Sequence, residues 1–148
     1  MKKILDKKKM IQLNAVVIIL VDQEGRMLLQ QRSFDTPVMP GYWAFFGGGI
    51  DEGESPLQSV IRETLEEIEH KLTNPQFIFE QDFVLENAEG HMRVYVERFY
   101  GDKKKLKLKE GRDWGWFTSG EMQQLKMILH DRLVIKKVEN HIRRKDEI

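Results

Sequence analysis

The chain has 148 residues, 41% of them hydrophobic and 32% charged, which predicts one domain over residues 1–148 with its own core rather than a disordered chain. Lys and Arg together number 24, as do Asp and Glu. This zero net charge argues against a nucleic-acid or membrane-surface binder, because such proteins carry a basic excess. The absence of cysteine excludes a disulfide scaffold, a thiolate zinc site and a cysteine nucleophile.

The first predicted element is a strand over residues 11–21, where Val and Ile are concentrated as in a strand buried on both faces. Its apolar run is far shorter than the roughly 20 residues of a membrane span. No small-residue cleavage site follows it, so we expect a cytoplasmic protein with no membrane partner. Turn residues at 22–25 and a second strand over 26–32 predict a hairpin. Residues 34–53, rich in Gly and Pro, predict a long functional loop.

A helix is predicted to begin after Ser55, which can form a capping box with Gln58. Its expected buried stripe consists of residues 57, 60, 61, 64, 65 and 68. Segments 77–85 and 92–100 then predict a second hairpin, and residues 116–117 predict a short strand. Ser119 and Asp131 are expected to cap two further helices. Strands mixed with helices around one core predict an α/β layered domain.

Acidic residues cluster on the helix that follows Ser55. Glu63, Glu66 and Glu67 lie within an arc of about 100° on an α-helix. Residues 51–69 contain seven carboxylates and one cation, Arg62, so a positive group is expected nearby. Such a helix is often only a solvated acidic face. Here, however, three glycines at 47–49 precede the helix and leave backbone carbonyls available to a ligand. A carbonyl oxygen and the carboxylate oxygens together form a ligand set that suits Mg²⁺ or Mn²⁺.

The same residues carry a longer pattern. The pattern resembles the box of the MutT-like Nudix hydrolase family, which has the fixed spacing G-x5-E-x7-R-E-U-x-E-E-x-G-U. The matching residues are Gly48, Glu54 and the segment 62–67 (Arg-Glu-Thr-Leu-Glu-Glu). The resemblance implies an α/β/α sandwich with a mixed sheet. Two positions depart from the family pattern: Glu69 stands where the box has glycine, and Phe46 stands where proline is usual. A glycine at position 69 would end the helix. Because Glu69 replaces it, we expect this helix to continue toward Leu72.

The resemblance also implies roles for these residues. Glu63, Glu66 and Glu67 would bind a divalent cation, with the Gly47 carbonyl as a further ligand. Glu54 and Arg62 would form a buried pair that ties the loop to the helix. The catalytic set would be Glu63, Glu66 and Glu67, and Glu63 is one candidate for the general base.

Three further residues have two interpretations each. Glu110 is a second candidate for the base or an extra metal ligand, or it is a solvent-facing residue after a lysine-rich run. Arg32 could bind a substrate phosphate, although an exposed arginine at the end of a strand is equally ordinary. Trp43 could stack on a nucleobase or belong to the core.

The function that this resemblance implies is Mg²⁺-dependent hydrolysis of a pyrophosphate bond in a nucleoside diphosphate linked to another group. The favoured substrate is a nucleoside triphosphate, damaged ones included, giving nucleoside monophosphate and pyrophosphate. The alternatives are a nucleotide-sugar hydrolase and a Nudix nucleotide sensor without catalysis. The expected partner is a small nucleotide; a homodimer is an open alternative.

Overall fold

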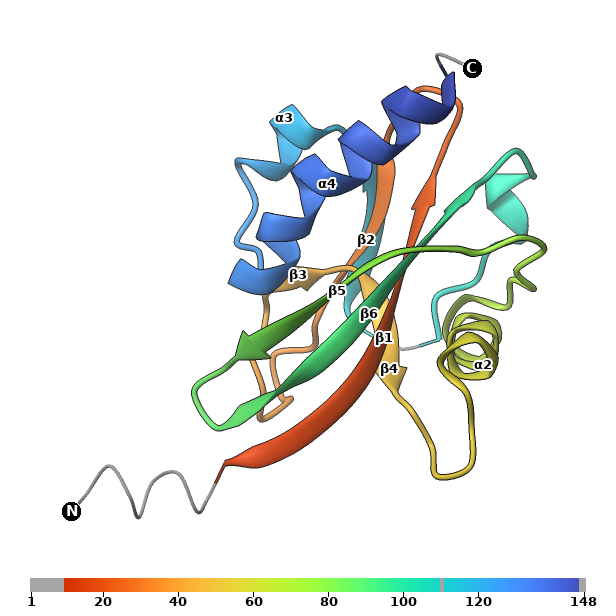
Figure 1. Ribbon diagram of the computed structural model, residues 1–148. Coiled ribbons are helices and arrows are strands. Elements are labelled where there is room, and N and C mark those ends of the chain that lie inside the picture. Colours follow the sequence, from red (N-terminus) through yellow and green to blue (C-terminus); the bar gives the residue numbers. More distant parts are fainter. Residues whose placement is uncertain (1–9, 110, 147–148) are drawn as a thin grey trace.

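The computed structural model describes residues 10–109 and 111–146, which form a sheet flanked by helices (Figure 1). Its strands are β1 (Ile11–Val21), β2 (Met27–Gln31), β3 (Trp43–Ala44), β4 (Phe46–Gly49), β5 (Gln76–Val84), β6 (Ala88–Arg98) and β7 (Asp113–Phe117). Its α-helices are α2 (Pro56–Ile68), α3 (Ser119–Met122) and α4 (Leu129–Asp146), and a 3₁₀ helix, η1, spans Lys103–Lys105.

The sheet is mixed and β1 lies at its centre. The strand order is β3-β2-β1-β6-β5, with β4 paired to β1 and β7 paired to β2. β1 runs parallel to β6, from Ile11 opposite Ala88 to Val21 opposite Arg98, while the other pairs are antiparallel. The two predicted hairpins, β1–β2 and β5–β6, are confirmed.

Helices cover both faces of this sheet, with α2 on one side and α3 and α4 on the other (Figure 1). Alternate residues of β1 therefore enter two hydrophobic cores. Val17, Ile19 and Val21 pack in the core that includes Val134 and Val138 of α4. The core on the α2 side contains Val16, Ile18, Leu20, Val60 and Ile68. The expected α/β sandwich is confirmed, and no helix among the described residues is long and apolar enough to cross a bilayer.

The glycine-rich segment differs from the prediction. Part of the expected loop 34–53 is strand, because β4 pairs with β1 over the register Ala15–Gly49 to Ile18–Phe46. The helix caps differ as well. Thr118, rather than Ser119, is the N-cap of α3 and forms a capping box with Glu121. Asp131 lies inside the first turn of α4 and its Oδ2 accepts the Phe45 N–H at 3.0 Å.

Helix α2 begins as predicted, with the Ser55–Gln58 capping box in place. It ends at Ile68 and does not continue toward Leu72, because Glu69 adopts the left-handed conformation (φ 55°) that the family's glycine would adopt. The left-handed region is compatible with a non-glycine residue at a modest cost in free energy. The buried stripe is also rotated from the expected one: residues 57 and 65 are exposed, and Glu67 is buried.

Candidate active site

The glycines of β4 hold that strand close to both β1 and α2. A Cβ on Gly47 would lie 2.1 Å from the carbonyl oxygen of Val16, and a Cβ on Gly48 would lie 2.4 Å from Cδ of Glu63. Only glycine therefore fits at these two positions without a shift of the backbone of β1 or of the Glu63 carboxylate. The acidic face of α2 is thus brought directly against the backbone of β4.

Arg62 is the positive group at the centre of this acidic segment. Its Nε and Nη2 donate to the two carboxylate oxygens of Glu54 at 2.6 and 2.9 Å, so the predicted partners lie in a bidentate ion pair that is partly rather than fully buried. Nη1 of Arg62 also contacts Glu63 Oε1 at 3.0 Å and Glu66 Oε2 at 3.2 Å. The hydrogen bonds from Arg62 lower the pKa of Glu54 to about 2. In return, Glu54 raises the pKa of Arg62, so both groups stay charged.

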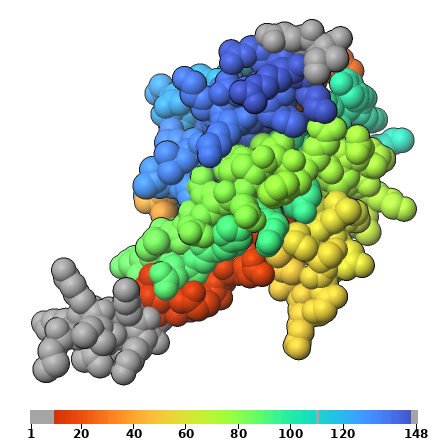
Figure 2. Space-filling view, viewed as in Figure 1, coloured from red at the N-terminus to blue at the C-terminus, as the bar shows by residue number. Residues whose placement is uncertain are grey.

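Arg62 also binds the loop that projects from the molecule between β4 and α2 (Figure 2). Its Nη2 lies 3.3 Å from Asp51 Oδ2 and donates to the carbonyl oxygen of Gly49 at 3.3 Å. Ser59 Oγ donates to the same carbonyl, also at 3.3 Å. The helix therefore fixes the end of β4 through side chains rather than through backbone pairing alone.

The three glutamates of α2 sit in different environments. The Glu66 side chain is 59% exposed and the Glu63 side chain 17% exposed, whereas Glu67 is only 5% exposed. Burial is the largest cause of the raised pKa of Glu63, whereas the hydrogen bond and the positive charge of Arg62 lower this pKa. Glu67 Oε2 accepts from Nε2 of Gln30 at 3.4 Å. A gradient of solvent access thus runs across one helix face, from the exposed Glu66 to the buried Glu67.

A cavity of about 280 Å³ opens beside the buried glutamate. Glu67 from α2, Gly47 from β4 and Arg32 after β2 all line it, so three residues singled out from the sequence come together. Arg32 is held in place there, because its Nε donates to the carbonyl oxygen of Val38 at 2.9 Å. Its role toward phosphate stays a prediction.

The sequence did not point to the other lining residues, Gln30, Ser33, Thr36 and Gly111. Gln30 could have been found, because it lies two positions before Arg32 on a predicted strand and therefore on the same face. Gly111 had no such signal. It approaches Gln30 because β7, which follows it, pairs with β2.

Trp43 is not among the residues that line this cavity. The ring of Trp43 packs edge-on against Phe117 at 5.2 Å between centroids, and Trp43 packs against the core on the α4 side. Its backbone N–H donates to the carbonyl oxygen of Lys126 at 2.8 Å. A role in stacking on a base stays a prediction. Glu110 lies outside the described residues.

The donor atoms of the site fit a hard divalent cation. The Glu63 carboxylate lies against the Gly48 backbone, and Gly47 shares a cavity with Glu67, so the available ligands are all oxygens. Across residues 10–109 and 111–146, no three acidic or histidine side chains already stand in an arrangement that could hold a metal ion. Arg62 instead contacts two of the carboxylates. Metal binding by Glu63, Glu66 and Glu67 therefore stays a prediction.

Residues 11–138 of this chain match the NUDIX domain family. Over 57 residues, 38% of this chain, it is 37% identical to nucleoside triphosphatase NudI of Escherichia coli O139:H28 and 39% identical to that of Escherichia fergusonii. The match spans only 40% of the length of these relatives.

Solved structures share the fold over most of the chain. The MutT protein from Methanosarcina mazei Go1 aligns with a TM-score of 0.78 at 20% identity, over 90% of this chain and 96% of that protein. The NUDIX domain of Shewanella oneidensis NrtR, solved in complex with ADP-ribose, aligns with a TM-score of 0.76 at 20% identity, over 92% of each chain. With the box residues now seen on α2 and β4 and the family match covering most of its length, the chain belongs to the Nudix domain family.

Proposed function

We propose that this protein is a pyrophosphohydrolase that uses Mg²⁺ or Mn²⁺ to cleave a nucleoside triphosphate, damaged ones included, into nucleoside monophosphate and pyrophosphate. The observation that carries this proposal is the juxtaposition of the α2 carboxylates with the glycines of β4, beside a cavity that Glu67, Gly47 and Arg32 line. The partial similarity to nucleoside triphosphatase NudI supports the substrate class.

The residues divide the work according to their positions. A divalent cation bound here supplies neutralisation of phosphate oxygens and activation of water. Glu67, buried at the cavity wall, would hold that cation with the Gly47 carbonyl, and Glu63 and Glu66 would complete the ligand set. Arg32, which the carbonyl oxygen of Val38 holds at the cavity, would bind a phosphate oxygen.

The chemical step is attack of a water oxygen on phosphorus with cleavage of the bridging P–O bond, and a carboxylate accepts the proton of the water. Glu63 is one candidate for this carboxylate, because it lies in the acidic cluster against the backbone of β4. Glu110 is the other candidate. The Glu54–Arg62 pair holds the loop and helix that carry these groups in a fixed relation.

A nucleotide sensor is the second candidate function. It is favoured by the contacts of Arg62 with one oxygen of Glu63 and one oxygen of Glu66, which balance part of their charge without a cation. A sensor would bind nucleotide at the same cavity without turnover.

A nucleotide panel with Mg²⁺ separates these functions. Canonical and oxidised nucleoside triphosphates and nucleotide sugars are incubated with the protein, and the products are separated by chromatography. The proposal expects monophosphate and pyrophosphate in a 1:1 ratio, and far less of both products when Glu67→Gln replaces the wild type. Preferred release of sugar phosphate would transfer the assignment to nucleotide sugars. Tight nucleotide binding without any product would favour the sensor, and neither binding nor turnover would refute both.

A further inference from the structure

The cavity beside Glu67 is too small to enclose a whole nucleotide. Its volume is about 280 Å³, whereas pockets that enclose drug-sized ligands measure about 300–1,000 Å³. The described residues that line it are polar or glycine, and none of them is aromatic. Such a lining suits the phosphate groups of the proposed substrate. The nucleobase therefore has to lie outside the cavity, against its rim.

An exposed aromatic ring stands at this rim. Phe34 is 60% exposed, and in the chain it lies between Ser33 and Thr36, which both line the cavity. The guanidinium carbon of Arg112 lies over the Phe34 ring, 4.7 Å from its centroid. Arg112 directly follows Gly111, which also lines the cavity. Two separate segments of the cavity wall therefore meet at this ring.

The surrounding backbone holds the Phe34 ring in place. The loop that carries it is closed at its base, because the Arg32 N–H donates to the carbonyl oxygen of Tyr42 at 2.8 Å. The Gly41 N–H donates to the carbonyl oxygen of Ser33 at 3.3 Å. Gly41 also packs against the ring, since a Cβ at this position would lie 2.5 Å from Cε1 of Phe34. A ring that is already positioned loses little conformational entropy when a ligand stacks on it.

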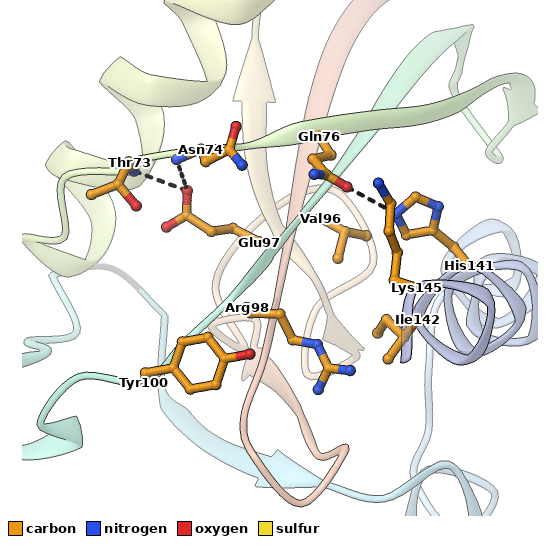
Figure 3. Close-up of a pocket in the computed structure, with 10 residues that line it drawn as sticks. All are labelled: Thr73, Asn74, Gln76, Val96, Glu97, Arg98, Tyr100, His141, Ile142 and Lys145. Carbon is orange, nitrogen blue, oxygen red and sulfur yellow. Dashed lines mark hydrogen bonds between the residues drawn. The ribbon is translucent and has the colours of Figure 1, made fainter. Parts of the chain in front are cut away.

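A single exposed aromatic residue is ordinary in itself, so its position decides. Among the described residues, the other exposed aromatic side chains are Phe77 and Tyr100. Phe77 lies on β5 and packs edge-on against Tyr95 at 5.7 Å between centroids. Tyr100 lines a second cavity, of about 330 Å³, near the end of β6 and the last turns of α4 (Figure 3). That cavity shares no lining residue with the cavity beside Glu67, so Phe34 is the exposed ring next to the proposed phosphate site.

We propose that Phe34 is a specificity-determining residue whose ring stacks on the nucleobase of the substrate, on the face opposite Arg112, while the phosphates lie in the cavity beside Glu67. This inference rests on the proposed function. Loss of one base–aromatic stack weakens binding about 5- to 150-fold. Because every nucleobase has a π-face, the contact favours nucleotides over phosphate compounds without a base and discriminates weakly among the bases.

The test measures by calorimetry, with Mg²⁺, the affinity for α,β-methylene-ATP and for inorganic tripolyphosphate, which has a chain of three phosphates but no base. Phe34→Ala should weaken the affinity for the ATP analogue about tenfold and leave that for tripolyphosphate nearly unchanged. In turnover of ATP, the same variant should raise KM and leave kcat close to wild type. The matched control, Phe77→Ala, removes an exposed ring away from the cavity and should change neither affinity.

Two further variants separate stacking from packing of the loop. Phe34→Trp keeps an aromatic face and should bind the analogue about as tightly as wild type, whereas Phe34→Leu keeps apolar bulk without that face and should bind it weakly. The inference is overturned if Phe34→Ala or Phe34→Leu binds the analogue as wild type does, if tripolyphosphate binding weakens equally, or if Phe77→Ala has the same effect. A wild-type protein that binds neither compound would refute the proposed function as well, whereas normal nucleotide binding and turnover in Phe34→Ala would refute this inference alone.

Discussion

Gly48→Ala tests whether the Glu63 carboxylate must lie where β4 and α2 hold it. The added Cβ would meet Glu63 Cδ at 2.4 Å and its oxygens at 2.5 and 2.6 Å, whereas ordinary contact begins at 3.4 Å. The carboxylate must therefore move by about 1 Å, which a flexible side chain can do without unfolding the protein. A displacement of about 1 Å in a catalytic site can lower the rate about 100-fold, equivalent to about 2.7 kcal/mol of activation free energy.

Gly49→Ala is the matched control, because a Cβ at that position meets no atom within 4 Å. Both substitutions remove about 0.4–1 kcal/mol of unfolded-state entropy, so this contribution cancels in the comparison. The assay is kcat/KM for pyrophosphate release with Mg²⁺, together with the melting temperature of each variant. Turnover at the wild-type rate by folded Gly48→Ala would show that the position of Glu63 does not matter, and equal losses in both variants would show that the effect is not steric.

Three further predictions address Glu67, Glu69 and Asp131. Glu67→Gln should lower turnover at least about 100-fold with a melting temperature close to wild type, because it removes charge from the proposed cation site; near-normal turnover would contradict the metal role. Glu69→Gly should stabilise the protein by about 1 kcal/mol in chemical denaturation, because Glu69 is left-handed at φ 55°. The same change at Lys71 lacks this benefit and should destabilise or be neutral, so equal effects would refute the explanation. Burial raises the pKa of Asp131 to about 7, so the folded state holds its proton more tightly than the unfolded state, and stability should fall as the pH rises from about 4 to about 7. Asp131→Asn should flatten that part of the melting-temperature profile, and an unchanged slope would exclude Asp131 as its cause.

Local signals in the sequence predicted much of the fold. The β1–β2 hairpin follows from its turn residues, and the start of α2 follows from the Ser55–Gln58 capping box, because both depend on neighbours in the chain. The end of α2 was missed because Glu69 adopts a backbone conformation that sequence patterns associate with glycine. The N–H of Glu69 donates to the carbonyl oxygen of Leu65 at 3.0 Å and closes the last turn of the helix there.

The sequence likewise predicted only part of the candidate site. The spacing of the box placed three glutamates on one face, but it could not show that Glu67 is buried and Glu66 exposed, since that depends on how α2 lies on the sheet. Nor could it show that Arg62 contacts Glu63 and Glu66. Gln30 and Gly111 meet only because β2 and β7 pair across the sheet.

The parallel pairing of β1 with β6 has a consequence for synthesis on the ribosome. Residue 11 lies opposite residue 88, so one edge of β1 waits for 77 further residues, which take roughly 4–15 s at typical translation rates. During that interval the run Val16–Val21, with no charge and high β-propensity, has the character of an aggregation-prone segment. The strand at the centre of the finished sheet is thus an aggregation-prone segment of the nascent chain until β6 has been made.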